Sequence, residues 1–120
     1  MRVFWHDRGS GGVSSDSAQE VDLKEAQSIW SDDIWPASCN FFGLIDDQER
    51  TIQFTFDIPD DVDEATYMGM KIVLMDFPEL ERKGSYCAHV THEEVYWLIE
   101  KAFKVGADYR QFGQLVFTPW

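Results

Sequence analysis

The fold is decided by residues 41–56, whose sequence is FFGLIDDQERTIQFTF. The first five residues form a short, mostly apolar run of the kind found in buried strands. After a polar turn, residues 51–56 alternate strictly between polar and apolar side chains, as a half-buried strand does. The apolar members share one face: Ile52, Phe54 and Phe56. The stretch therefore predicts a β-hairpin with its apolar face towards the core.

Two helices are predicted by their capping residues. Asp22 and Glu25 have the spacing of a capping box, and apolar residues then recur at helical spacing until about residue 32. Thr91 and Glu94 form a second capping box, which opens a longer apolar periodicity ending near Gly106. Both stretches are expected to pack an apolar face against the sheet.

Further strands are predicted at 2–7, 71–75, 84–90 and 115–118, which gives the order β-α-β-β-β-β-α-β. Strands that follow one another without intervening helices favour antiparallel pairing. We therefore expect an α+β fold, with a single layer of mostly antiparallel sheet of about six strands and two helices packed on one side. The 120 residues fit a single domain, 1–120, with a flexible Gly/Ser loop at about 9–18.

The charge of the chain is unusually negative. Ten lysines and arginines oppose 22 aspartates and glutamates, for a net charge of −12, whereas a small soluble domain typically carries a magnitude of roughly 2 to 8. Such a charge speeds encounter with cationic partners and argues against direct binding to nucleic acid or anionic membranes. An equally simple interpretation is that the charge serves solubility alone.

Several classes of protein have no signal in the chain. No stretch approaches the roughly 18 apolar residues of a membrane span, and the first residues lack the basic-then-apolar pattern of a signal peptide. We therefore expect a cytoplasmic location. Cys39 and Cys87 do not make a disulfide framework and are expected to be buried free thiols.

Catalytic and metal-binding patterns are weak. Cys87 and His89 share a strand face and His92 follows, but a structural zinc site needs four ligands, and the remaining soft ligands, Cys39 and His6, are isolated in sequence. A Cys–His nucleophile pair would need a base within hydrogen-bond reach, whereas strand positions two apart are several ångströms apart. We expect no cofactor, no metal and no enzymatic activity; a small Cys/His enzyme remains the less favoured alternative.

The acidic segment 57–64 is the strongest candidate for a binding site. Its carboxylates do not follow calcium-loop spacing and lack the turn glycine, so either a solvated loop or recognition of a basic partner accounts for them. Tyr and Met beside them are adaptable contact residues. The predicted partner-binding residues are Asp57, Asp60, Asp61, Asp63, Glu64, Tyr67 and Met68. Trp5, Trp35 and Trp120, near chain ends or turns, are candidates for an exposed anchor.

A family resemblance covers roughly residues 38–120. The 41–54 hairpin, the strand from Gly84 leading into the helix start at 90–95, and the closing segment 115–120 resemble small immunity proteins encoded beside bacterial polymorphic toxins. The resemblance implies a cytoplasmic protein that binds one cognate toxin domain and occludes its active site. Many such toxins act on nucleic acids through basic clefts, and an acidic surface would imitate the nucleic-acid backbone.

Two other binding roles stay open at this level. An acidic mimic of nucleic acid, or another protein-binding module, would act on a host enzyme instead of a toxin. A structural or assembly subunit would form a strong homo-oligomer, whereas an immunity protein is expected to be a monomer or a weak dimer. In none of these readings is a nucleic acid or a membrane a direct partner.

Overall fold

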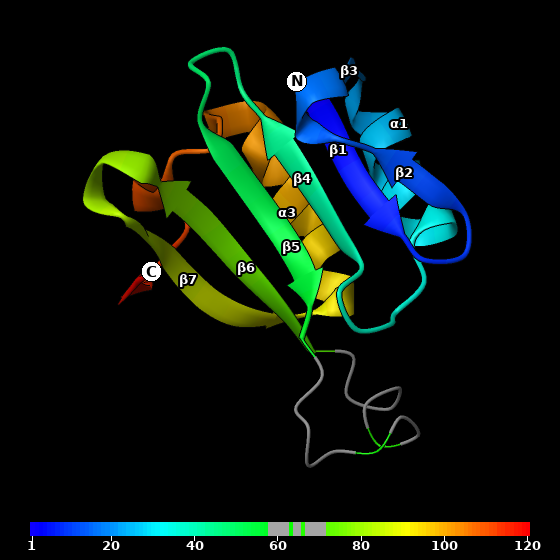
Figure 1. Ribbon diagram of the computed structural model, residues 1–120. Coiled ribbons are helices and arrows are strands. Elements are labelled where there is room, and N and C mark those ends of the chain that lie inside the picture. Colours follow the sequence, from blue (N-terminus) through cyan, green and yellow to red (C-terminus); the bar gives the residue numbers. More distant parts are fainter. Residues whose placement is uncertain (58–62, 64–65, 67–71) are drawn as a thin grey trace.

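The structure, a computed structural model, describes residues 1–57, 63, 66 and 72–120. Their strands form one antiparallel sheet in the order β2-β1-β4-β5-β6-β7-β8, with β3 paired to β1 (Figure 1). The strands are β1 (Arg2–Asp7), β2 (Gly11–Val13), β3 (Gln19–Glu20), β4 (Phe41–Ile45), β5 (Thr51–Phe56), β6 (Ile72–Glu79), β7 (Gly84–Thr91) and β8 (Val116–Pro119). The predicted α+β class and the 41–56 hairpin are confirmed.

The sheet has eight strands instead of about six because residues 11–20 contribute two of them, β2 within the Gly/Ser-rich segment and β3 just after it. β2 pairs with β1 through Trp5 and Val13, and β3 pairs with β1 through Val3 and Gln19. A Cβ at Gly12 would overlap the backbone of Trp5, so this close pairing requires glycine. The flexibility of the 9–18 segment stays a prediction.

Both predicted capping boxes are present. Asp22 opens α1 (Leu23–Ser28), which continues as a π-helical turn, η2 (Ile29–Asp33), and Thr91 opens α3 (His92–Val105). The C-terminal stop of α3 at Gly106, with φ of 78°, also agrees with the sequence. Short 3-10 turns complete the described elements: η1 (Ser15–Ser17), η3 (Leu80–Arg82) and η4 (Tyr109–Gln111).

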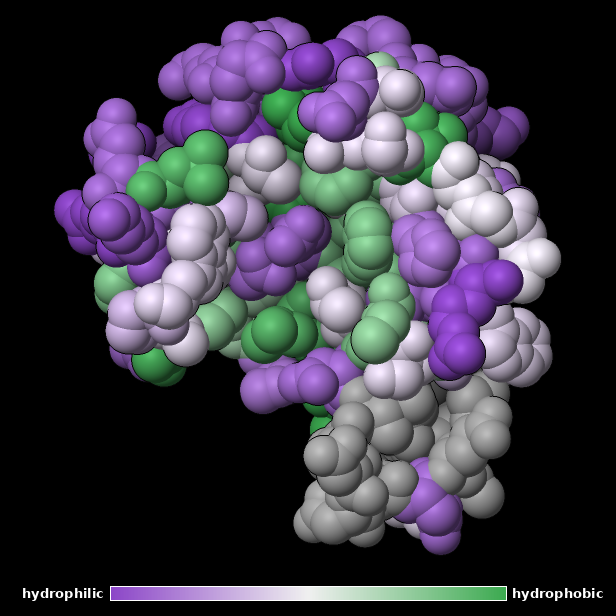
Figure 2. Space-filling view, viewed as in Figure 1, coloured by the Kyte–Doolittle hydropathy of each residue, from purple (hydrophilic) through white to green (hydrophobic). Residues whose placement is uncertain are grey.

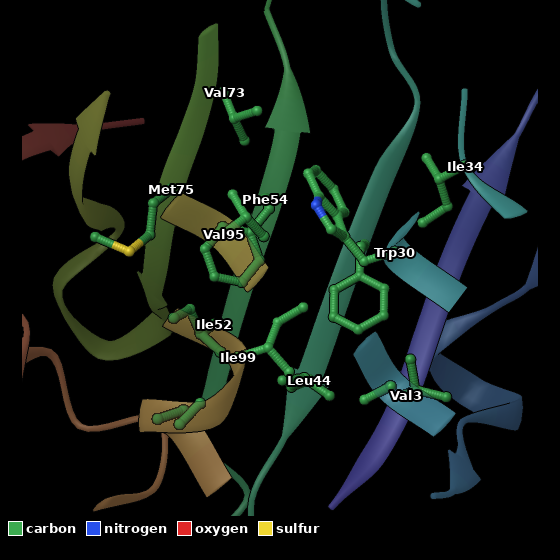
Figure 3. Packing of buried hydrophobic residues seen from close by; sticks show 14 of the residues in the cluster. Val3, Trp30, Ile34, Leu44, Ile52, Phe54, Val73, Met75, Val95 and Ile99 are labelled. Atoms are coloured by element: carbon green, nitrogen blue, oxygen red, sulfur yellow. The ribbon is translucent and has the colours of Figure 1, made fainter. Parts of the chain in front are cut away.

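The core lies between the two helices and one face of the sheet. Trp30 is its centre: its indole stacks on the Phe56 ring at 5.1 Å and 5° and contacts the ring of Phe42. Trp30 also contacts Phe54, which lies beside it in Figure 3. Val95 and Ile99 of α3 point at the same face of the sheet and are fully buried. Five of the largest fully buried side chains are aromatic, and aromatic side chains bury a large area each.

One strand boundary was predicted wrongly. The strand predicted at 71–75 continues further in the structure, because β6 runs through Phe77 and Pro78, a residue that usually ends a strand, to Glu79. Phe77 is buried against the ring of Phe112, at 5.0 Å between centroids, so packing extends the strand beyond the proline signal. The turn that follows places Lys83 in the left-handed region, with φ of 53°.

The helices cover one face of the sheet and leave the other uncovered. In Figure 1, α3 lies behind β4 and β5, so the viewer looks at the uncovered face. Figure 2 shows hydrophobic side chains across the middle of this face, with hydrophilic ones around much of its rim. Within the described parts of the chain, no helix has the length and apolarity needed to cross a membrane.

Candidate functional site

One end of the sheet gathers segments that are distant in sequence. There, the Phe56 backbone N–H donates to the Asn40 carbonyl (3.0 Å), and Ile72 pairs with Thr91, the residue that caps α3. The start of β4, the end of β5, the start of β6 and the start of α3 therefore meet at the lower end of the molecule in Figure 1. The turn η2 joins them because Trp30 stacks on Phe56.

Exposed aromatic side chains and carboxylates surround two open clefts at this end. The clefts have volumes of about 440 and 290 Å³ and share Ser31 and His92 in their walls. Trp35 borders the larger cleft and is 63% exposed, while Trp97 borders the smaller one and is 65% exposed. The residues of this surface, which we call the aromatic–acidic end, are Ser31, Asp32, Asp33, Trp35, His92, Glu93, Tyr96 and Trp97.

Trp35 is held in place by the buried carboxylate of Asp7, at the end of β1. Asp7 Oδ1 accepts hydrogen bonds from the Trp35 backbone N–H and from Asn40 Nδ2, both at 2.8 Å. Asn40 Nδ2 also donates to the Trp35 carbonyl (2.8 Å). Asp7 Oδ2 accepts from the backbone N–H groups of Gly9 and Ser10. The backbone N–H and carbonyl of Trp35 are therefore both hydrogen-bonded, which fixes the position from which the exposed indole projects.

Replacing Asp7 with asparagine should lower the free energy of unfolding by about 2 kcal/mol at pH 7, because an amide N–H₂ would face backbone donors. The Trp35 N–H, followed by other N–H groups, holds the pKa of Asp7 below its ordinary value of 3.8. Because the folded-state pKa is lowered, this stabilisation is present above the unfolded pKa and is lost as pH falls through the folded value. Urea unfolding at pH 7 and pH 3 measures the difference in the free energy of unfolding between wild type and Asp7→Asn, which should be smaller at pH 3. An equal difference at both pH values would contradict this role of Asp7.

The start of α3 is equally well fixed. Trp30 Nε1 donates to the His92 carbonyl (3.3 Å), and the His92 ring lies against the rings of Trp30 and Phe56, at 5.0 and 5.7 Å between centroids. Gln27 Nε2 donates to the Tyr96 carbonyl (3.1 Å), which ties the next turn of α3 to α1. Trp97 therefore projects from a rigid helix start, with Tyr96 packed edge-on against it.

The predicted acidic residues are only partly within the described chain. Asp57 follows β5 at the same end of the sheet, and its 56%-exposed carboxylate lies 3.7 Å from His89 Nε2. Asp63 Oδ1 accepts a hydrogen bond from the Thr66 N–H (2.7 Å). Asp60, Asp61, Glu64, Tyr67 and Met68 lie outside the described residues, so their role in binding stays a prediction.

The cysteines and histidines do not converge on one site. Both cysteines are free, but Cys39 is exposed and Cys87 is half-buried, which corrects the prediction that both are buried. Cys39 sits in the turn before β4 with φ of 72°. Cys87 Sγ is within hydrogen-bond reach of the Val116 carbonyl (3.4 Å), whereas His89 lies near Asp57. Among the described residues, no group of three or more His, Cys, Asp or Glu side chains is placed to hold a metal ion.

Sequence reasoning missed two residues that the structure brings forward. Trp97 does not lie on the apolar face of α3, which Val95 and Ile99 define. A tryptophan on the polar face of a helix could have been recognised from the helical spacing in the sequence. Asp76 is a carboxylate within the otherwise apolar strand β6 and is buried. The expected exposure is confirmed for Trp35 and Trp120, whereas Trp5 is half-buried; their role as binding anchors stays a prediction.

Comparison of the chain with models of protein families, with curated proteins and with solved structures finds no match. Function is therefore inferred from the chemistry of the chain itself.

Proposed function

We propose that this protein is a cytoplasmic immunity protein, which binds a cognate toxin domain with a basic, nucleic-acid-acting site and occludes that site. The observation that carries the proposal is the aromatic–acidic end, where two exposed tryptophans border clefts lined by carboxylates. The resemblance of residues 38–120 to immunity proteins of polymorphic toxin systems points the same way.

The tryptophans supply the apolar part of such an interface. Trp, Tyr and Arg dominate the binding energy of protein interfaces, and a few central residues carry most of it. The Trp35 backbone is fixed by its hydrogen bond to Asp7, which also binds Asn40. Trp97 lies in the N-terminal half of α3, which Thr91 caps. Because both supports are already ordered, binding costs little additional conformational entropy.

The carboxylates supply the charge. Asp32, Asp33 and Glu93 surround the two tryptophans, on a chain whose net charge is −12. Exposed carboxylates attract a basic surface over a distance and add mainly to the association rate and to specificity. A cleft that binds a phosphate backbone is the kind of basic surface that this end complements in charge.

The experiment that tests the proposal is affinity capture from the source organism's lysate at about 50 and 500 mM salt, with the Trp35→Ala/Trp97→Ala double variant as matched bait. We expect wild-type protein, and not the variant, to retain one basic domain at low salt and to inhibit its activity. Capture of a host nucleic-acid enzyme instead would support the nucleic-acid-mimic alternative. Equal retention by both baits would contradict the proposed site.

Salt should change the association rate far more than the dissociation rate. Electrostatic steering falls steeply as the Debye length shrinks from roughly 14 Å at 50 mM to about 4 Å at 500 mM, so we expect the association rate constant of the captured domain to drop by at least about tenfold. Surface plasmon resonance over a salt series measures both rates. A rate of association that is unchanged by salt would remove the electrostatic part of the proposal.

A further inference from the structure

The uncovered face of the sheet carries a row of side chains that crosses every long strand. Strand register aligns Phe4 with Gly43, Gly43 with Gln53, Gln53 with Asp76, and Asp76 with Cys87. The flanking residues of β6, Met75 and Phe77, belong to the core on the other side of the sheet. Asp76 therefore points away from the core, towards the face seen in Figure 2.

Asp76 is unlike the other buried carboxylates described above. Asp7 accepts five backbone and side-chain bonds around its two oxygens. Asp46 accepts from the backbone N–H groups of Gln48, Arg50 and Ala107 and from the Arg50 side chain. Asp76 is only 8% exposed, yet its recorded partner is the neutral amide of Gln53, at 3.1 Å. Within the described chain, no cation forms an ion pair with it.

The Asp76 carboxylate is largely buried, with Gln53 and Cys87 beside it on the neighbouring strands. The Phe4 ring lies over Gly43, two strands away, and is itself buried. Leu74, two residues before Asp76 on β6 and on the same face, is half-buried. A largely buried carboxylate attracts a cation more strongly than one in water does, because screening is weaker there.

We infer that the uncovered face around Asp76 is a second docking surface, which receives an arginine or lysine side chain of the bound protein. The inference rests on the proposed function in that the occupant belongs to a protein partner. A cation supplies the counter-charge that Asp76 lacks within the described chain, and arginine fits best because its planar guanidinium pairs with a carboxylate through two hydrogen bonds. A second copy of this chain is disfavoured because both copies would carry the same −12 charge.

Docking at Asp76 should depend on pH. Burial raises the pKa of Asp76 from 3.8 to about 6, so protonation between pH 7.5 and 5.5 removes the charge that the cation needs. Along this row Phe4, Gly43 and Gln53 are neutral and Cys87 faces Asp76 from β7. His89 lies two residues further along β7, near Asp57. Replacing Asp76 with asparagine therefore isolates the contribution of the Asp76 charge.

The test uses the free protein and a short probe, acetyl-Gly-Arg-Gly amide, with the neutral citrulline peptide as its matched control. Two-dimensional NMR follows the Gln53 side-chain amide and the β6 amides during titration at pH 7.5 and 5.5. We expect the arginine peptide to shift these signals at pH 7.5, with about tenfold weaker binding at this locus in Asp76→Asn. Asp47→Asn, the same substitution at an exposed turn, should bind like wild type.

The outcomes separate this inference from the proposed function. Equal shifts with both peptides, or shifts that persist unchanged in Asp76→Asn, would overturn docking at Asp76 even where a toxin domain is captured. Conversely, arginine-specific shifts that Asp76→Asn abolishes support the docking surface whether or not the lysate yields a toxin.

Discussion

Asp76→Asn is expected to raise the free energy of unfolding by about 3 kcal/mol at pH 8. The pKa of Asp76 in the folded protein is raised from 3.8 to about 6 because the carboxyl group is buried. Each pKa unit corresponds to about 1.4 kcal/mol. The ionised Asp76 side chain therefore lowers the free energy of unfolding by about 3 kcal/mol at any pH well above 6. Asparagine preserves the shape and a hydrogen bond with Gln53 but carries no charge.

The sign of the pH dependence identifies the cause. A carboxyl group whose pKa is raised in the folded state stabilises that state most at pH values below its unfolded pKa. This stabilisation is lost as pH rises through about 6, the pKa of Asp76 in the folded protein. The advantage of the variant should therefore be full at pH 8, smaller at pH 5, and absent below the unfolded value of 3.8. Urea unfolding at these three pH values measures it, with Asp47→Asn as the control. A variant less stable than wild type at pH 8 would mean that Asp76 has a favourable partner in solution.

Trp97→Ala is expected to weaken binding of the partner domain by over 100-fold, or about 3 kcal/mol, as removal of a central aromatic anchor does. The folded state should hardly change, because the Trp97 side chain is 65% exposed and its contact is with exposed Tyr96. The expected change is mainly in the dissociation rate, because an apolar contact acts after encounter. Isothermal titration calorimetry with the captured domain measures the affinity.

Trp120→Ala provides the matched control for this prediction. Trp120 is 66% exposed, almost the same as Trp97, but it lies at the opposite end of the sheet, where its backbone N–H donates to the Lys83 carbonyl (2.8 Å). Affinity should be unchanged in this variant. Similar losses in both tryptophan variants would indicate a general effect of surface aromatic residues and not the aromatic–acidic end.

The elements that the sequence predicts well are those fixed by neighbouring residues. The alternation in 51–56 and the capping boxes at Asp22 and Thr91 depend on side chains within a turn or two, and each appears as expected. The α+β class follows because strand runs without intervening helices pair antiparallel.

The candidate site depends on contacts between residues far apart in the chain, which local patterns do not reveal. Trp35 is positioned by Asp7, 28 residues away, and the start of α3 by Trp30, 62 residues from His92. The buried state of Asp76 likewise depends on which strands flank β6. β2 was missed because glycines at 11 and 12 are typical of a turn, whereas here they allow close pairing with β1.

The placement of Asp76 and of the exposed tryptophans has a common physical meaning. A charge that destabilises the folded protein and large apolar side chains left in water both lower stability or solubility without serving the core. Residues that break local rules in this way are expected at functional sites, where a partner supplies the missing contact. Both features lie outside the core formed by Trp30 and its neighbours.

The most direct test of the central claim is amide hydrogen exchange of the protein alone and in complex with the captured domain. Binding at the aromatic–acidic end predicts that protection is gained at residues 31–36 and 92–98, where Trp35 and Trp97 lie. Protection gained only at the opposite end, in the turns 46–50 and 80–84, would contradict it.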